Sequence, residues 1–278
     1  MNPPTTFRQK LAAAAVQNDS LLCIGLDPVI EKLPAAMLAE DNPILRFTSE
    51  IIEATSDLAC AYKPNFAFFG ALGESGWHTL EMTLERIPSH IPVILDAKVG
   101  DIGNSAEQYA RMFFEQLGAD ALTVNPYMGH DAVAPFLDYG DRGVFLLCLT
   151  SNPGAADFQT LRVDDEPLYQ RVARQAQTWN NGAGNCGLVV GATRADTLIE
   201  LRQLAPRLPL LVPGVGTQGG DLESVVVNGL DSAGEGLVIN ASRSVIYASA
   251  GADFADAARS AVIAMRADIN GLRQPTST

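Results

Sequence analysis

The densest group of charged residues in the sequence is segment 96–102, which ends a run of apolar residues. If that run is a β-strand, Asp96 and Lys98 are two residues apart and face the same side, with Asp101 in the turn beyond. Carboxylates on both sides of an ammonium favour its charged form, so we expect Lys98 to donate a proton rather than to act as a nucleophile. A Schiff-base aldolase needs the opposite, a lysine whose neutral form is favoured by an apolar pocket or by another cation.

Two further charged residues, Asp27 and Lys63, end earlier apolar runs. A charge at the end of an apolar run must be paired or solvated. With segment 96–102 they make three carboxylates and two ammoniums, which can alternate around one site. Because lysines already fill the cation positions, this grouping disfavours a divalent metal, and the three scattered histidines have no zinc-site spacing. The plainer interpretation is that these charges form salt bridges at a rim.

A second candidate site is the glycine-rich segment 212–220, in which Gly214, Gly216 and Gly219 match the spacing G-x-G-x-x-G. A dinucleotide site of this type also needs an acidic residue at the end of the next strand, and that strand ends in Asn-Ala-Ser-Arg, with Arg243 last. We therefore interpret the segment as a phosphate site, in which backbone N–H groups and Arg243 would hold a phosphate monoester. The alternative is a glycine-rich turn beside a surface arginine.

The elements that must position these residues are eight apolar runs separated by amphipathic stretches. The runs are residues 21–27, 59–65, 92–98, 121–126, 143–151, 186–193, 209–216 and 237–243. They do not alternate strictly, as expected of parallel strands buried on both faces. Helical patterns lie between them, for example at residues 105–117, 168–180 and 195–205. Eight such units in 278 residues are typical of an α/β protein of the (β/α)8 TIM barrel type, whose C-terminal strand ends meet at one mouth. The alternative is an open doubly wound sheet, which usually has fewer strands.

No linker divides the chain, so residues 1–278 are expected to form a single domain with frayed ends at about residues 1–6 and 271–278. Two connections are long for a barrel, namely residues 152–167 and 217–236. Long loops after barrel strands often cover ligands, and the glycines of the second would let it move.

The composition excludes several classes of function. Asp and Glu total 32 against 19 Lys and Arg, so the net charge is −13 and the chain would repel nucleic acid. No apolar run reaches membrane-spanning length, and no secretion signal opens the chain. The four cysteines are far apart in apolar runs and form no C-x-x-C pair, which indicates buried thiols and a cytoplasmic location.

Together the motifs resemble the orotidine 5′-phosphate decarboxylase family, in its longer bacterial type. The resemblance spans residues 27–243 and rests on four segments in order along the chain: Asp96-x-Lys98-x-x-Asp101-Ile102, Ser151-Asn152-Pro153-Gly154, Pro213-Gly214-Val215-Gly216-x-Gln218-Gly219-Gly220, and Arg243. It implies a cofactor-free lyase of de novo pyrimidine biosynthesis. Such an enzyme converts orotidine 5′-monophosphate to UMP and CO₂ through a C6 carbanion, which Lys98 would stabilise and protonate.

The resemblance also implies a charged catalytic tetrad and a homodimer. The tetrad would be Lys63, Asp96, Lys98 and Asp101, with Asp101 contributed by the other subunit. Two further residues, Ile102 and Ser105, would reach substrate across the dimer. The family pattern here is Asp-Ile-Pro-Asn-Thr, whereas this chain reads Asp-Ile-Gly-Asn-Ser. Ser105 keeps the hydroxyl of the family's threonine, but Gly103 stands in place of the proline. The expected consequence is a less stiff turn.

The remaining residues implied by the resemblance bind substrate, and no metal is implied. Asp27 and Lys63 would contact the ribose hydroxyls, and Ser151 would bind the pyrimidine. The 5′-phosphate would be held by Gln218 and Arg243, next to Pro213 in the glycine-rich segment.

Two other functions stay open at this point. Sugar-phosphate lyases and aldolases of the same barrel superfamily, such as 3-keto-gulonate-6-phosphate decarboxylase and hexulose-phosphate synthase, share the Asp-x-Lys-x-x-Asp element but use a divalent metal. They carry a glutamate at the second strand, where this chain has Lys63. The third possibility is a barrel that binds a phosphate ligand without catalysis.

Overall fold

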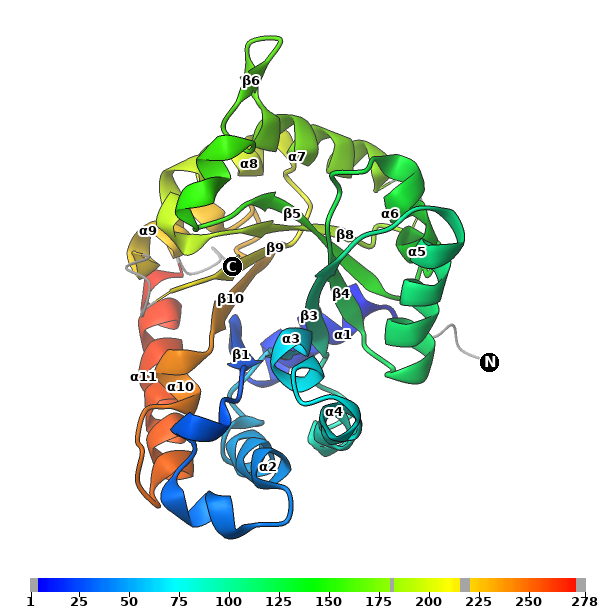
Figure 1. The fold of residues 1–278 in the computed structure, drawn as a ribbon. Helices are drawn as coiled ribbons and strands as arrows, with labels where there is room; N and C mark the ends of the chain where they lie inside the picture. The colour runs from blue at the N-terminus through cyan, green and yellow to red at the C-terminus, as the bar shows by residue number, and fades with distance from the viewer. Residues whose placement is uncertain (1–4, 181–182, 216–220, 274–278) are drawn as a thin grey trace.

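The computed structural model describes residues 5–180, 183–215 and 221–273. Its main sheet has eight parallel strands: β1 (Leu22–Leu26), β2 (Ala61–Pro64), β3 (Ile94–Val99), β4 (Ala121–Val124), β5 (Gly143–Leu149), β8 (Cys186–Val190), β9 (Leu210–Pro213) and β10 (Leu237–Ala241). Their spatial order is β2-β1-β10-β9-β8-β5-β4-β3. Two isolated parallel bridges, Tyr62 to Val93 and Asn65 to Asp96, join β2 to β3 and close the sheet. The predicted (β/α)8 TIM barrel is confirmed (Figure 1).

Helices surround the barrel (Figure 1). They are α2 (Pro43–Thr55), α3 (Phe66–Gly70), α4 (Glu74–Arg86), α5 (Gly103–Ala110), α6 (His130–Leu137), α7 (Leu168–Trp179), α8 (Ala195–Leu204), α9 (Leu222–Gly229), α10 (Arg243–Ile246) and α11 (Phe254–Leu272). The helix expected at residues 105–117 is α5 followed directly by a π-helix, Arg111–Gln116. Those expected at 168–180 and 195–205 are α7 and α8.

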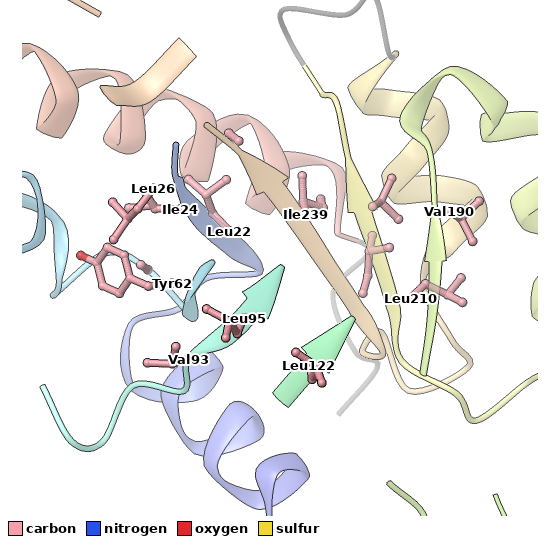
Figure 2. Packing of buried hydrophobic residues seen from close by; sticks show 14 of the residues in the cluster. Leu22, Ile24, Leu26, Tyr62, Val93, Leu95, Leu122, Val190, Leu210 and Ile239 are labelled. Atoms are coloured by element: carbon pink, nitrogen blue, oxygen red, sulfur yellow. The ribbon is translucent and has the colours of Figure 1, made fainter. Parts of the chain in front are cut away.

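Both faces of the strands are buried, by two separate sets of apolar side chains. The outer set lies between the strands and the helices, and Figure 2 shows some of its members, among them Leu22, Ile24 and Tyr62. The inner set fills the barrel and includes Cys23 and Phe145. Helix α1 (Phe7–Gln17) closes the N-terminal end, where the ring of Phe7 packs edge-on against that of Phe145 at 5.7 Å. The opposite, C-terminal end is therefore the end left for a ligand.

The structure differs from the expectations in the connections and the termini. The long loop expected at residues 217–236 contains helix α9, which begins after its N-cap Asp221. The connection 152–167 contains a 3₁₀ helix, Pro153–Asp157, and a hairpin of β6 (Arg162–Val163) and β7 (Glu166–Pro167) that projects from the barrel (Figure 1). Helix α11 continues to Leu272, into the C-terminal segment expected to be frayed, whereas α1 begins at Phe7 and only its N-cap, Thr6, belongs to the N-terminal one.

Candidate active site

A cavity of about 570 Å³ opens at the C-terminal ends of the strands. Most of the residues singled out in the sequence line it, and they come from six of the eight strands or the residues just beyond them. They are Asp27, Lys63, Asp96, Lys98, Ser151, Pro213 and Arg243. Gln218 lies outside the described residues. The expectation that these side chains meet at one mouth of the barrel is thus confirmed for seven of them.

A buried carboxylate between two ammoniums forms the charged centre of this cavity. The Nζ atom of Lys63 lies 2.7 Å from Asp96 Oδ2, and the Nζ atom of Lys98 lies 2.5 Å from Asp96 Oδ1. Lys63 and Asp96 are almost fully buried, whereas the Lys98 side chain is 44% exposed. Lys98 is thus the ammonium that faces the open cavity.

Lys63 and Asp96 hold each other ionised within this centre. Burial alone would lower the pKa of Lys63, but Asp96 and Asp27 raise it above its usual value. Burial alone would raise the pKa of Asp96, but Lys63 and Lys98 bring it well below its usual value. Both oxygens of the Asp96 carboxylate are taken by ammoniums, so the centre offers positive charge to a ligand at Lys98 rather than a free carboxylate.

Lys98 lies in a β-bulge, whereas the sequence suggested a regular strand from Asp96 to Lys98. The pairing of β3 with β4 shifts register between Leu95 and Val99. Within that bulge Lys98 has a φ of 49°, in the left-handed region that residues with a side chain rarely adopt. The side chains of Asp96 and Lys98 do contact each other, as expected, but their directions are set by a β-bulge and not by a regular strand.

Asp27 follows β1 and presents an acceptor to the cavity. Its Oδ1 atom is buried and has no hydrogen-bond partner within the described chain. The backbone around it is fixed by Tyr247, whose hydroxyl accepts a hydrogen bond from Val29 N at 2.7 Å and donates one to Asp27 O at 3.2 Å. A buried acceptor without a donor suits a ligand hydroxyl.

Two cationic side chains of the cavity lining have no carboxylate partner among the described residues. Arg243 is the first residue of α10, is exposed, and forms no ion pair with any described residue. Its neighbour Ser242 lies against β1 so closely that a Cβ at Gly25 would be 1.8 Å from Ser242 Oγ, and only glycine fits there. Lys32 also lines the cavity, with its Nζ 5.7 Å from the centre of the Tyr247 ring. Such side chains can attract a phosphate.

Ser151 follows β5, where the connection leaves the barrel. A Cβ at Gly191 would lie 2.7 Å from Ser151 N, so the glycine allows β8 to run against this turn. Beside it, Gln159 Oε1 accepts a hydrogen bond from Thr150 N at 2.7 Å, and Thr150 Oγ1 donates one to Asn152 Oδ1 at 2.6 Å. These bonds fold the start of the long connection back over the cavity edge.

Three predicted residues, Asp101, Ile102 and Ser105, do not line the cavity. Asp101 forms no ion pair with any residue in the described ranges, so within one chain the cavity has two carboxylates, Asp27 and Asp96, and not the three expected. Its Oδ1 instead accepts a hydrogen bond from Ile102 N at 2.8 Å. The turn beyond contains Gly103 with a φ of 52°, which proline cannot adopt, so the departure from the family pattern changes the backbone path and not only its stiffness.

Several lining residues were missed by sequence reasoning: Lys32, Asn65, Asn240, Ser242 and Tyr247. Asn65 and Asn240 lie in or beside apolar runs, and reading every polar residue there, rather than the charged ones first, would have found them. Asn240 Oδ1 is buried and has no partner in the part of the chain that is described. Lys32 and Tyr247 come from connections whose fold the local pattern does not specify.

With this geometry in hand, the chain can be compared with known proteins. The model of a family described as orotidine 5′-phosphate decarboxylase / HUMPS matches residues 20–259. The chain belongs to the orotidine 5′-phosphate decarboxylase / HUMPS family. The resemblance that the four sequence segments indicated is therefore confirmed.

Members of the orotidine 5′-phosphate decarboxylase / HUMPS family match almost the whole chain. An orotidine 5′-phosphate decarboxylase of Herpetosiphon aurantiacus is 52% identical over 271 residues, which cover 97% of this chain and 100% of that protein. One of Thermomicrobium roseum is 51% identical and covers 97% and 96%. The solved structure of Leishmania donovani OMP decarboxylase is 42% identical, with a TM-score of 0.84 and coverage of 97% and 99%.

Two further observations concern the helices and the thiols of the described chain. No helix in the described ranges is both long and apolar enough to cross a membrane. All four cysteines are buried and unpaired, as the sequence predicted. Burial raises the pKa of the Cys23 thiol to about 12, so it is unreactive at neutral pH.

Proposed function

We propose that this chain decarboxylates orotidine 5′-monophosphate to UMP and CO₂ in de novo pyrimidine biosynthesis, and that it does so without a cofactor. The observation that carries the proposal is one cavity whose lining contains both the Lys63–Asp96–Lys98 centre and Arg243. The substrate has an anionic group at each end, a carboxylate on the ring and a phosphate on the ribose. The cavity lining offers a cationic group for each of them, Lys98 and Arg243.

The chemistry follows from charge. When the bond between C6 and the carboxylate breaks, CO₂ leaves and its electron pair stays on C6, where no carbonyl is placed to delocalise it. The Lys98 ammonium stabilises that localised charge and then transfers a proton from Nζ to C6, which gives UMP. Water returns a proton to Lys98. Asp96 binds the ammonium and holds it in place between turnovers, and Lys63 fixes the Asp96 carboxylate.

Substrate binding is divided among the walls of the cavity. Asp27 and Lys63 bind the ribose hydroxyls, which is supported by the unpartnered Oδ1 of Asp27. Ser151 binds the pyrimidine. The phosphate is bound by Arg243, next to Pro213, and by Gln218 of the glycine-rich segment. Binding energy from the phosphate, remote from C6, can then hold the ring against Lys98.

A second copy of the chain completes the site in this proposal. Asp101 would enter the partner's cavity beside Lys98, with Ile102 and Ser105 also reaching across. The support is a set of exposed apolar side chains beside the turn: Ile102, Tyr127, Met128 and Phe158, which are 42–76% exposed. The rings of Tyr127 and Phe158 are 6.3 Å apart, so two of them form one surface. Exposed apolar surface of this kind is typical of a protein interface.

The cellular location in this proposal is the cytoplasm, since four buried and unpaired thiols suit a reducing compartment.

The test is an absorbance assay on orotidine 5′-monophosphate with the purified protein, with and without EDTA. We expect loss of substrate absorbance, formation of UMP, and the same rate in EDTA. Activity that EDTA abolishes would favour the metal-dependent lyases of the superfamily. A protein that binds UMP but leaves the substrate unchanged would be a binding barrel, and the proposal would be wrong.

A further inference from the structure

The bulge that carries Lys98 is opposed by a single residue of β4. Leu95 pairs with Leu122, and the next pair is Val99 with Val124. Between these pairs β3 has three residues, Asp96 to Lys98, whereas β4 has only Thr123. One residue cannot supply backbone partners to three. The backbone N–H groups of the bulge therefore need another acceptor.

The Thr123 side chain supplies that acceptor. Its Oγ1 accepts hydrogen bonds from Ala97 N at 3.0 Å and from Lys98 N at 2.9 Å. The same hydroxyl donates to Asp96 Oδ1 at 3.0 Å. A threonine hydroxyl has one proton and two lone pairs, so all three positions are used. Thr123 is 1% exposed, and water has little access to replace it.

These bonds act on both groups of the Lys98–Asp96 pair. Two of them hold the backbone N–H groups at and before Lys98, where φ is 49°. The third binds the Asp96 oxygen that also receives Lys98 Nζ. The hydroxyl thus fixes the direction from which the lysine leaves the strand and the orientation of the carboxylate it meets.

We infer that Thr123 is a positioning residue for the proposed decarboxylation. This inference rests on the proposed function, since it concerns the ammonium that acts on C6. Thr123 does not line the cavity and acts through Lys98 and Asp96. Its hydroxyl matters most when charge develops at C6, because a displaced ammonium loses the interaction made only in the transition state. Binding of the ribose and phosphate, at Asp27 and Arg243, does not depend on it.

The test uses two pairs of variants that differ by the hydroxyl. The parent Thr123 is compared with Thr123→Val, which has nearly the same shape, and Thr123→Ser is compared with Thr123→Ala. In each pair we expect loss of the hydroxyl to lower kcat at least tenfold, while the Kd for UMP changes less than threefold. Thr123→Ser should keep kcat within threefold of the parent. If Thr123→Val does not fold, the serine and alanine variants give the same comparison.

A matched control is Thr83→Val in helix α4, which contributes no residue to the cavity lining. Thr83 is buried, donates to Thr79 O at 2.7 Å and meets Thr48 Oγ1 at 3.2 Å, so it also loses buried hydrogen bonds. We expect it to lower the melting temperature but to leave kcat unchanged. A kcat loss of less than tenfold in both hydroxyl pairs would overturn the role of Thr123. A parent that leaves orotidine 5′-monophosphate intact would overturn the proposed function itself.

Discussion

Lys63 of β2 donates a hydrogen bond to Asp96 of β3 at 2.7 Å, across the seam where the barrel closes. There the two strands are joined by isolated bridges only. The ion pair therefore contributes to both the fold and the site. It joins β2 to β3, the strands at the two ends of the sheet order, and it fixes the carboxylate that Lys98 contacts.

Replacing Lys63 by methionine should destabilise the fold strongly. The Asp96 carboxylate would stay buried with one partner fewer, and breaking a buried ion pair costs about 3–5 kcal/mol. We expect the free energy of unfolding in urea to fall by about 3 kcal/mol. The control is Arg46→Met, which breaks the largely exposed pair with Glu50 and should cost less than about 1 kcal/mol. Equal losses in the two variants would contradict a role for the ion pair in closing the barrel.

Asp96 should also make the free energy of unfolding depend on pH in the acid range. Its pKa is lower in the folded than in the unfolded chain, so its contribution is present above about pH 4 and is lost as the pH falls toward the folded pKa. Below pH 4 the unfolding free energy of the parent should fall more steeply than that of Asp96→Asn, by up to about 1.4 kcal/mol per pH unit. Urea titrations of both proteins between pH 6 and the acid limit measure this, and parallel curves would be inconsistent with it.

The main effect of Arg243→Ala should be weaker binding of the substrate phosphate. Hydrogen bonds to charged groups contribute about 1.5–3 kcal/mol, so KM should rise roughly 10- to 100-fold. Turnover falls as well if the bound phosphate helps to hold the ring. With the parent enzyme, added phosphite dianion should partly restore activity on a substrate that lacks the phosphate. Identical kinetics for Arg243→Ala and the parent would remove Arg243 from the site.

The shared site can be tested by mixing two inactive variants. Lys98→Ala and Asp101→Ala subunits are combined in equal amounts and allowed to exchange, with exchange followed by tagged chains. Half of the dimers become mixed, and one of the two sites in each then has both Lys98 and Asp101. About a quarter of all sites should regain parent activity. No recovery, with exchange confirmed, would mean that Asp101 serves its own chain.

The sequence predicted the barrel and most of its mouth because both depend on local pattern. The eight apolar runs correspond to the eight strands. A charged residue at the C-terminal end of a buried strand must be paired or solvated, and the mouth of the barrel is where that can occur. The strand ends at Asp27, Lys63 and Arg243 were therefore assigned to the cavity correctly.

What the sequence missed depends on contacts between distant segments. The bulge at Lys98 needs Thr123 from the next strand, and no local period distinguishes it from a regular strand. The loop expected at residues 217–236 contains helix α9, in which β-branched residues such as Val225 and Val226 have a weak helix propensity. Burial against the core outweighs their weak helix propensity.

We propose that the Lys98 ammonium acts on the charge that develops at C6. The measurement that tests this role is kcat on orotidine 5′-monophosphate for Lys98→Ala, with UMP binding measured on the same preparation. We predict that turnover is abolished while UMP still binds, because the interaction is made in the transition state. A variant that keeps more than about a tenth of the parent activity, a loss of under roughly 1.4 kcal/mol in the barrier, would contradict the claim.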